Sequence, residues 1–589
     1  MSWNLRKELK DLLAKETGTK IYAPGQRTPV AFLYPNTYHL GMSNLGLHIL
    51  YQVLDRHGWA VERCFLPGRK ELPEYVKTKT PLLSVENQRP LTEFPYICAT
   101  MCFELDYVHL LEELRLGRIV LTAADRGEQD PFVIVGGPCA TFNPEPLADF
   151  VDCFVIGEGE ETLPRLLELL EQMRFDGRSR QEKLQAAANL PGIYVPAFYT
   201  PQYDEDGHFT GMTAAPGVPR TIARQWVKDL EQYPHTSAIV SPLTEFANMY
   251  IVEVARGCGR HCRFCMAGYC FRKPRNRQFD ALWRDIEGRP AQTAKVGLMG
   301  AAVSDYPDMD RLTERLVAEH VPFSCASLRA DALSLQLVQA LAACGQRTMT
   351  VAPEAGSAKM RAAINKGITE EHIYEAMEYA AEAGMPNIKL YFMIGLPGEE
   401  DEDIEEMIRL VHRVRARMDE LGHKGDLVLS VNPFVPKPFT PYQWSPMTPL
   451  PVLKKRIKML QAGFRKDRRI RLLTESLKES VQQAVLSRGT RRLGAVLRRC
   501  LNEGISFRDA LAAAGLDEQE LAGAACDVGA PLPWGHLDMG VREQYLAQER
   551  KCSDAGAFTP PCFDGCRRCG VCTEAMDGQD SDRTVGKEA

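Results

Sequence analysis

The sequence lacks the features of a membrane-inserted or exported protein. No apolar run in its 589 residues approaches the roughly 18 residues that a membrane-spanning helix needs. The stretch MSWNLRKELKDLLAKE is charged and has no apolar core, so we expect no secretory signal there. The net charge of −6 is too small to favour or exclude a nucleic-acid partner. We expect a cytoplasmic protein of three or four domains, at about 100–200 residues per domain.

Cysteine, by contrast, is plentiful, and several of the 18 cysteines lie in tight clusters. Without an export signal, such clusters indicate metal ligation rather than disulfides. Cys258, Cys262 and Cys265 have the spacing C-x3-C-x2-C, which can hold three irons of a 4Fe–4S cluster and leave the fourth without a protein ligand. Electron-transfer clusters usually take four cysteines, so three favour a cluster that acts on a bound molecule. The alternatives are a structural zinc site, which favours paired C-x2-C units and a fourth ligand, or three unrelated cysteines.

The segment ARGCGRHCRFCMAG, with Phe264 directly before the last cysteine of the triplet, resembles the radical S-adenosylmethionine (SAM) enzymes. The resemblance implies that the unique iron chelates the amino and carboxylate groups of SAM, with Phe264 beside the cofactor. It also implies reductive cleavage of SAM to methionine and a 5′-deoxyadenosyl radical. The partner would be a reductant of the flavodoxin or ferredoxin type.

Residues 1–173 consist of repeated units of strand, glycine turn and helix. The apolar runs VAFLY, FVIVGGP and CFVIG each lead into a turn and a helix. This order predicts an α/β domain with a doubly wound, Rossmann-like sheet, which binds ligands at the carboxyl ends of its strands. The turns Gly136–Gly137 and Gly157, Glu158, Gly159 fall at such ends, where backbone N–H groups can approach a nucleotide-like tail.

Beside the radical SAM triplet, the segment GGPCATFNPEPLADFVDCFVIGEGE resembles the cobalamin-binding domains that precede many radical SAM cores. The resemblance implies that the two glycine turns flank the dimethylbenzimidazole tail of cobalamin, and that Thr100 supplies a hydroxyl. The D-x-H-x-x-G loop of methionine-synthase-type domains is absent, and no aspartate precedes His39. We therefore expect bound cobalamin to lack a protein histidine ligand, with His39 structural or lining the pocket. The alternative is a domain that keeps the fold and binds no cobalamin.

Residues 174–245 are predicted to be a connecting segment, and residues 246–450 a partial barrel. Six strand-like runs, from MYIVEV to LVLSVNPF, alternate with helical stretches. This alternation predicts a (β/α)6 arrangement that is open on one side, with its chemistry at the C-terminal ends of the strands.

Several polar residues follow those strands. The resemblance to radical SAM enzymes implies that the turn at Gly300 holds the SAM amino group through its backbone. Glu354 could accept hydrogen bonds from a ribose hydroxyl or an ammonium group. Arg329 and Arg361 could face the SAM carboxylate, because a guanidinium makes paired bonds to such a group. The alternative for each side chain is a surface or helix-capping role.

The end of the chain predicts a second metal site. Residues 451–545 contain basic, apparently helical stretches such as FRKDRRIRLL, and five arginines there could form a stripe that meets phosphates: Arg488, Arg491, Arg492, Arg498 and Arg499. Residues 546–577 contain four closely spaced thiols, a complete ligand set for zinc or a 4Fe–4S cluster: Cys562, Cys566, Cys569 and Cys572. We favour iron–sulfur, which could relay electrons to the first cluster. Residues 578–589 are predicted to be disordered.

From YPNTYHLGMSNLG to the last cysteines, the chain resembles a subgroup of cobalamin-type radical SAM proteins with a C-terminal cysteine cluster. We expect an enzyme that cleaves SAM and uses cobalamin for methyl transfer to, or rearrangement of, an unknown substrate, with RNA among the candidates. A methylthiotransferase is a second hypothesis, although the front cysteines are dispersed, at Cys64, Cys98, Cys102, Cys139 and Cys153. A third is an RNA- or ribosome-associated iron–sulfur binding protein without turnover.

Overall fold

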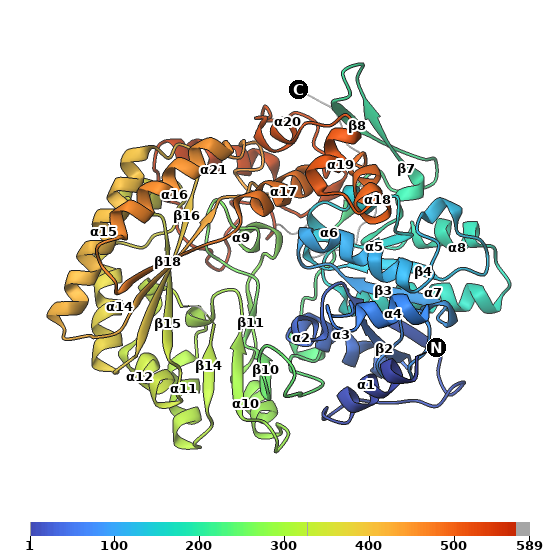
Figure 1. The fold of residues 1–589 in the computed structure, drawn as a ribbon, viewed down its shortest axis with the longest axis horizontal. Coiled ribbons are helices and arrows are strands. Elements are labelled where there is room, and N and C mark those ends of the chain that lie inside the picture. Colours follow the sequence, from blue (N-terminus) through green and yellow to red (C-terminus); the bar gives the residue numbers. More distant parts are fainter. Residues whose placement is uncertain (1, 327, 573–589) are drawn as a thin grey trace.

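A parallel sheet forms the centre of the N-terminal domain in the computed structural model, which describes residues 2–326 and 328–572 (Figure 1). Its six strands pair in the order β2-β1-β3-β4-β5-β6, and only β6 runs antiparallel to its neighbour. The strands are β1 (Pro29–Tyr34), β2 (Ala60–Phe65), β3 (Tyr96–Thr100), β4 (Phe132–Gly136), β5 (Cys153–Val155) and β6 (Ile193–Tyr194). Their nearly continuous burial is typical of a sheet covered on both faces.

Helices connect these strands and cover the sheet. They are α1 (Trp3–Leu13), α2 (Tyr38–Gly41), α3 (Leu45–Arg56), α4 (Leu72–Thr78), α5 (Tyr107–Leu116), α6 (Pro138–Phe142), α7 (Gly159–Phe175) and α8 (Arg180–Ala187). Helix α3 begins where the Asn44 side chain accepts the N–H of Leu47, a standard N-cap. It packs against α7 and against the first strand of the central domain, so it lies between the two domains.

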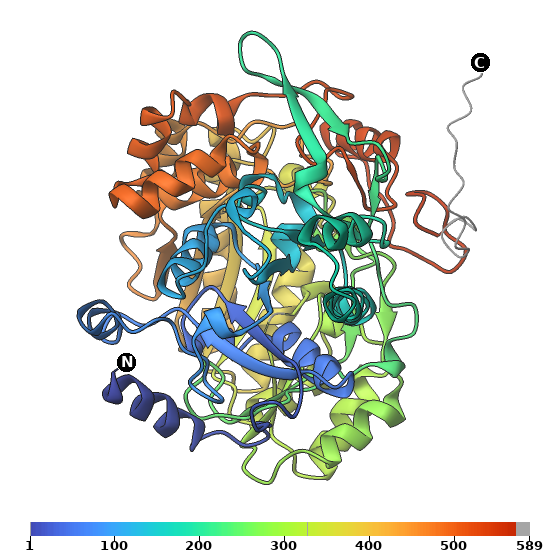
Figure 2. The same ribbon diagram turned by 90° about the vertical axis from the view of Figure 1, so that its right-hand side faces the viewer.

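The predicted connecting segment contributes to the N-terminal domain. Its residues 193–194 form β6, the last strand of the sheet. Beyond it, β7 (Tyr199–Tyr203) and β8 (Phe209–Ala214) form a hairpin that projects from the body of the molecule, as the view in Figure 2 shows. The short strand β9 (Ile222–Ala223) pairs with β19 (Leu537–Asp538) from the end of the chain.

The central domain contains two parallel sheets, with strand orders β10-β13-β14 and β15-β16-β17-β18. A bridge between Leu328 and Val351 links the sheets. The strands are β10 (Met249–Glu253), β13 (Lys295–Met299), β14 (Phe323–Cys325), β15 (Thr348–Glu354), β16 (Asn387–Ile394), β17 (Leu427–Pro433) and β18 (Ile470–Thr474), with a small hairpin of β11 (Ala255–Arg256) and β12 (Arg275–Asn276). The α/β class with parallel strands is confirmed.

Helices lie outside these sheets, with α14, α15 and α16 forming the outer layer on the left of Figure 1. They are α9 (Ala267–Cys270), α10 (Phe279–Glu287), α11 (Met309–Ala318), α12 (Leu335–Ala343), α13 (Ala358–Ala363), α14 (Glu370–Glu382), α15 (Asp401–Glu420) and α16 (Leu450–Phe464).

The segment FRKDRRIRLL is not helical throughout, contrary to the prediction. Residues 470–474 form β18, which pairs in parallel with β17. Ile470 is buried and Arg471 exposed, as expected for an edge strand whose successive side chains point to opposite faces. The arginine content concealed this alternation in the sequence.

The C-terminal helices span both domains (Figure 1). They are α17 (Leu477–Arg488), α18 (Leu493–Glu503), α19 (Phe507–Ala513), α20 (Glu518–Gly523) and α21 (Glu543–Asp554). Helix α18 packs on α5, and the side-chain amide of Asn143 donates to the carbonyls of Ser487 (3.1 Å) and Gly489 (2.8 Å). Within the described residues, no helix combines the length and apolarity needed to cross a membrane.

Candidate cluster site and adjoining cavity

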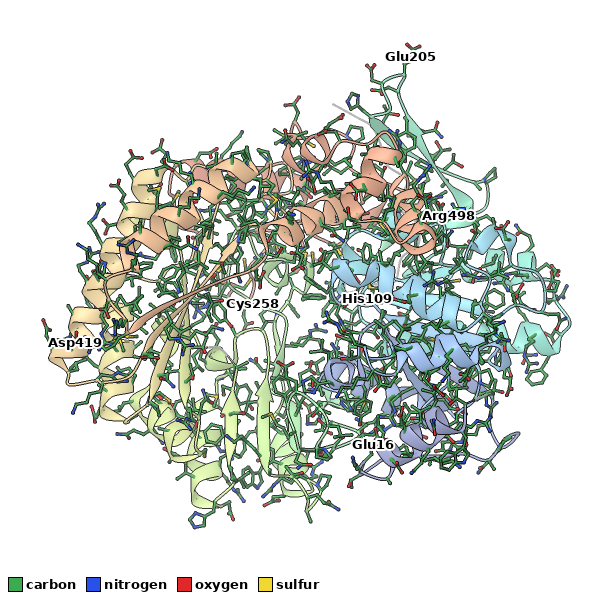
Figure 3. The ribbon with its side chains drawn as sticks, in the orientation of Figure 1. Glu16, His109, Glu205, Cys258, Asp419 and Arg498 are labelled. Carbon is green, nitrogen blue, oxygen red and sulfur yellow. The ribbon has the colours of Figure 1, made fainter. Side chains whose placement is uncertain are left out.

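The three predicted cluster cysteines share one loop that follows β10 and β11, and Cys258 lies near the centre of the molecule (Figure 3). Cys262 is buried, and Cys258 and Cys265 are half-buried. Burial, followed by the neighbouring thiols of Cys262 and Cys258, raises the pKa of Cys265 to about 12. The three thiols are therefore within range of one another's charge, and a bound metal would have to supply the positive charge that ionises them.

The donor set is three thiols on one loop. Among residues 2–326 and 328–572, no three His, Cys, Asp or Glu side chains are placed so that they could hold one metal ion. In an iron–sulfur cubane each thiolate binds a different iron, so three cysteines can hold three irons.

The cysteine loop is fixed by its backbone and by one buried arginine. Gly257 has φ +80°, and a Cβ there would lie 2.1 Å from the carbonyl oxygen of Phe271, so only glycine fits. The Arg263 side chain is fully buried and pairs with Glu549 of α21 at 3.0 Å. It also donates to the carbonyl of Ala363 at 2.8 Å. The C-terminal segment thus stabilises the cysteine loop through this buried ion pair.

Arg329 and Glu354 occupy neighbouring strand ends, as predicted, but each already has a partner. The Arg329 guanidinium makes two 2.9 Å bonds to the Asp331 carboxylate and a third to the carbonyl of Lys366. The Lys366 ammonium lies 3.1 Å from the Glu354 carboxylate. The charge of Cys262 acts on Arg329, so this network borders the cysteine loop.

Sequence reasoning missed two members of this network, Lys366 and Arg260. Arg260 lies between the first two cysteines and pairs with Asp305 (2.8 Å) and Asp331 (3.3 Å). The position of Arg260 between two predicted cluster cysteines could have identified it from the sequence. Lys366 carries no such signal, because its partner Glu354 is separated from it by a helix, α13.

Arg361 and Phe264 have structural contacts. The Arg361 side chain is buried and donates to the carbonyls of Gly356 (2.7 Å) and Ile368 (3.0 Å). It therefore stabilises its own helix and the loop after it, which is the structural role given above as the alternative. Phe264 is half-buried and packs on an apolar cluster that includes Met360 and Phe434, which holds the second half of the cysteine loop.

A cavity of about 580 Å³ lies between the N-terminal sheet and the cysteine loop. Every residue predicted to bind cobalamin lines it: Thr100, Gly136, Gly137, Gly157, Glu158 and Gly159. From the central domain, Ala255, Arg256, Gly257 and the predicted SAM residue Gly300 line it as well. The structure thus brings the glycine turns of one domain and the entrance to the cysteine loop of the other to a single space.

Two of the cavity glycines have conformations that only glycine adopts readily. Gly137 has φ +96°, and a Cβ there would meet the Met101 carbonyl oxygen at 2.7 Å. Gly157 has φ +106°, and a Cβ there would lie 2.1 Å from the Gln225 carbonyl oxygen. Thr141, which the sequence did not single out, accepts the Gly157 N–H at 3.0 Å and so joins the two turns.

Glu158 lines the cavity, but its carboxylate serves the domain interface. It binds Arg275 at 2.5 Å and Arg256 at 3.2 Å, and accepts the N–H of Val227 at 2.8 Å. Burial alone would raise the pKa of Glu158, but the hydrogen bond and charge of Arg275 and the charge of Arg256 outweigh it and lower the pKa to about 2. Glu158, which was predicted to contact the cofactor, therefore forms an interdomain ion pair next to the cavity.

No histidine is among the described residues that line this cavity. His39 is exposed, with its Nδ1 3.1 Å from the Leu243 carbonyl oxygen, and belongs to a separate 310 Å³ hollow beside α1. Of the front cysteines, Cys98 and Cys102 line the large cavity. Burial raises the pKa of Cys98 above its usual range and that of Cys102 to about 11, so both are neutral thiols.

The predicted basic stripe does not form a continuous surface. Arg488 is buried and donates to the Ala522 carbonyl at 2.8 Å. Arg491 binds the buried Glu145 at 3.1 Å, while Arg499 pairs with Glu503 one helical turn away at 3.1 Å. Three of the five predicted arginines are thus bonded to acceptors within the protein.

The four C-terminal cysteines come next to the cysteine loop of the central domain. The Cys562 N–H donates to the carbonyl of Gly259 at 2.8 Å. Cys566 and Cys569 are buried, and Cys562 and Cys572 are half-buried. The last residues of the predicted metal segment, 573–577, and the predicted disordered end, 578–589, lie outside the described residues.

Comparison with family models matches two parts of the chain. Residues 46–196 match the model described as "Radical SAM proteins, N-terminal", and residues 252–411 match the model of the Radical SAM superfamily. The second match begins in β10 and contains the cysteine triplet. Residues 252–411 form a radical SAM domain. The chain is accordingly a radical SAM enzyme, which agrees with the resemblance carried by the triplet.

Relatives match over much of the length. The chain is 29% identical to the uncharacterized protein MJ0966 of Methanocaldococcus jannaschii over 476 residues, covering 80% of this chain and 90% of that protein. It is 24% identical to a tRNA-2-methylthio-N(6)-dimethylallyladenosine synthase of Herminiimonas arsenicoxydans, covering 61% of this chain and 71% of that enzyme. Among solved structures, the radical SAM methyltransferase TsrM from Kitasatospora setae, with cobalamin and a [4Fe–4S] cluster bound, aligns with a TM-score of 0.49 at 15% identity, covering 83% of this chain and all of that one.

The variant Glu158→Gln tests the interdomain ion pair. Removing one member of a buried pair leaves uncompensated charge, so we expect the free energy of unfolding of the apoprotein at pH 7 to fall by about 3–5 kcal/mol. The pKa of Glu158 is lowered by folding, so its contribution is present above the ordinary value of 4.5 and is lost as the pH falls toward about 2. At pH 3.5 the difference between variant and wild type should shrink by about 1.4 kcal/mol, one pH unit's worth.

Denaturant titration at both pH values measures these differences. The matched control is Glu161→Gln, in the same helix, where the side chain is 41% exposed and its pairing with Arg165 is long, at 3.7 Å. Its effect should stay within about 0.5 kcal/mol. Equal losses of unfolding free energy for the two variants, or a Glu158→Gln effect that does not change with pH, would contradict a buried interdomain ion pair.

Proposed function

We propose that this radical SAM enzyme cleaves SAM reductively and uses cobalamin, held in the 580 Å³ cavity, for methyl transfer to or rearrangement of a substrate. When bound, the cluster would supply the electron that cleaves SAM to methionine and a 5′-deoxyadenosyl radical, and cobalamin would carry the methyl group. A flavodoxin- or ferredoxin-type reductant in the cytoplasm would be the electron source.

One observation supports the proposal above all. The cavity is lined on one side by the glycine turns Gly136–Gly137 and Gly157 and on the other by Arg256–Gly257, the residues that lead into Cys258. A large cofactor in this space would lie directly beside the cluster loop. Apolar pockets with a few polar groups, formed where two domains meet, are typical sites for such ligands.

The chain's own residues have definable tasks in this scheme. Cys258, Cys262 and Cys265 would hold three irons. Arg329 and Glu354 would orient SAM, exchanging bonds to Asp331 and Lys366 for bonds to its carboxylate, ribose or ammonium groups. These side chains are half-buried and already hydrogen-bonded, so their positions are fixed before a ligand arrives.

A methylthiotransferase is the second candidate, favoured by the match to tRNA-2-methylthio-N(6)-dimethylallyladenosine synthases. RNA would then be the substrate. Against it, the front cysteines are dispersed over separate elements, with Cys64 on β2, Cys98 on β3 and Cys153 on β5. Four of them are buried, and burial raises the pKa of each thiol: Cys64, Cys98, Cys139 and Cys153.

The tail supports a further element of the proposal, a second metal centre. Cys562, Cys566, Cys569 and Cys572 would hold either a second 4Fe–4S cluster or zinc. Cys569 is anchored through its carbonyl, which accepts the N–H of Arg542 at 2.9 Å. The predicted RNA contact through the basic stripe is not part of the proposal, because Arg488 and Arg491 are bonded internally.

Cys262→Ala tests the cluster assignment. Anaerobically reconstituted wild-type protein with reductant and SAM should form 5′-deoxyadenosine, measured by liquid chromatography, and the variant should form none, because two thiolates cannot hold the cluster. Cys270→Ala is the matched control, a buried cysteine five residues after the triplet. It should keep the iron content and the product. Product formation by the Cys262 variant would refute the assignment.

Gly136→Leu tests the cavity. A Cβ at Gly136 would meet nothing closer than 3.7 Å, so leucine is tolerated by the backbone while its side chain extends into the space that cobalamin would take. We expect the fold, measured by circular dichroism, to persist and bound cobalamin, measured by its visible spectrum after reconstitution, to fall at least tenfold. Gly523→Leu on α20, where a Cβ meets no atom within 4 Å, is the control. Equal cobalamin binding by both variants would place the cofactor elsewhere.

A further inference from the structure

The C-terminal cysteine segment and the first-cluster loop are built as one unit. Besides the bond from the Cys562 N–H to Gly259, Asn365 ties them together, because its side-chain amide donates to the carbonyls of His261 (3.1 Å) and Thr559 (2.9 Å). Asn365 also accepts the Thr559 N–H at 2.9 Å. Two segments that lie about half the chain apart therefore share their hydrogen bonds.

His261 links the cysteine triplet of the central domain to the C-terminal cysteines. It precedes Cys262 directly, it is 2% exposed, and its Nε2 lies 3.6 Å from the sulfur of Cys562. Its other ring nitrogen, Nδ1, is 2.8 Å from Nη2 of Arg272 and also contacts the Tyr545 hydroxyl. A guanidinium has donors only, so Nδ1 must accept. The ring is therefore neutral with its proton on Nε2, which points that N–H at the Cys562 sulfur.

The surroundings of the four C-terminal thiols suit an anionic centre. Arg568 donates from Nε to the sulfur of Cys566 at 3.3 Å. Arg272 is 1% exposed, its charge acts on Cys569 and Cys562, and its Nη1 has no hydrogen-bond partner among the described residues. A buried guanidinium nitrogen left without an acceptor marks a place for a ligand that supplies one. A cluster ligated by four thiolates carries negative charge and sulfur acceptors.

The N–H donors around these thiols favour a cluster over zinc. The four thiols lie within range of one another's charge, since the charges of Cys569, Cys566 and Cys572 all affect Cys562. In a cubane each thiolate binds a separate iron, and the cluster sulfides accept hydrogen bonds besides the ligand sulfurs, whereas a four-thiolate zinc site has no sulfides. Nη1 of Arg272, unpaired among the described residues, has an acceptor only if the centre supplies one.

We propose that Cys562, Cys566, Cys569 and Cys572 ligate a second 4Fe–4S cluster, and that His261 on the first-cluster loop donates a hydrogen bond to the sulfur of Cys562. The inference rests on the second metal centre proposed above but not on SAM cleavage or cobalamin. Hydrogen bonds to ligand sulfurs raise cluster reduction potentials, because they stabilise the more negative reduced state. His261 is thus a positioning residue that makes the potential of the second cluster depend on the loop of the first.

The test uses the full chain with the first cluster removed, as the triple variant Cys258→Ala, Cys262→Ala and Cys265→Ala. After anaerobic reconstitution with iron and sulfide it should contain about four irons per chain. An electron paramagnetic resonance redox titration gives the midpoint potential. Adding His261→Leu should make reduction about tenfold less favourable, a shift of about 59 mV to lower potential for one electron.

Two matched variants in the same background show whether the donor itself is responsible. His261→Gln places a donor near the position of Nε2 and should restore most of the potential. Arg260→Gln alters the adjacent residue, whose side chain binds Asp305 and Asp331 of the central domain, and should leave the potential unchanged. In the unsubstituted triple variant, electron–nuclear double resonance with ¹⁵N-histidine should detect an exchangeable proton and a histidine nitrogen coupled to the reduced cluster.

Four irons, a lower potential for His261→Leu alone and the histidine coupling would establish the proposal. Zinc in place of iron, or no metal, would overturn the second cluster. An unchanged potential with leucine would overturn the hydrogen bond, and if that variant does not fold, absence of the histidine coupling would do so. Failure of these measurements would not count against SAM cleavage by the protein with the wild-type triplet. Loss of 5′-deoxyadenosine formation with the second cluster intact would count only against the proposed function.

Discussion

The relation between the two domains depends on a buried set of ion pairs at their interface. Glu158 of the N-terminal domain binds Arg256 and Arg275, which flank the cysteine loop, and Arg256 also binds Glu160 and Glu253. Separating the domains would leave these charges buried without partners, which costs far more than the loss of exposed pairs. The width of the cavity and its distance from the cysteine triplet are therefore set by charge pairing as much as by apolar packing.

Local features of the site could be predicted from the sequence. The C-x3-C-x2-C spacing, the glycine turns at Gly136–Gly137 and Gly157, and the parallel sheet of the N-terminal domain all depend on residues close together in the chain. Backbone conformation explains this success: the positive φ angles of Gly137 and Gly157 are needed wherever the turn is made, whatever the rest of the fold does. In the folded protein these turns line one cavity together with Gly300.

What the sequence could not reveal are pairings between distant segments. Glu158 looked like a cofactor contact because its partners are about 100 residues away, and Arg491 looked like a phosphate contact because Glu145 precedes it by 346 residues. Residues 470–474 looked helical because their strand pairing with β17 lies in tertiary structure. A charged side chain shows its chemistry in the sequence, but whether it meets solvent, ligand or an opposite charge is decided by the fold.

The salt bridge between Arg263 and Glu549 has a consequence for how the protein is made. The two residues are separated by 286 positions, and the guanidinium of Arg263 is fully enclosed once they meet. During synthesis, the nascent chain presents the triplet long before the carboxylate that neutralises this arginine exists. The loop reaches its final form only after residue 549 has been translated, so insertion of the first cluster into its finished loop follows synthesis of the C-terminal segment.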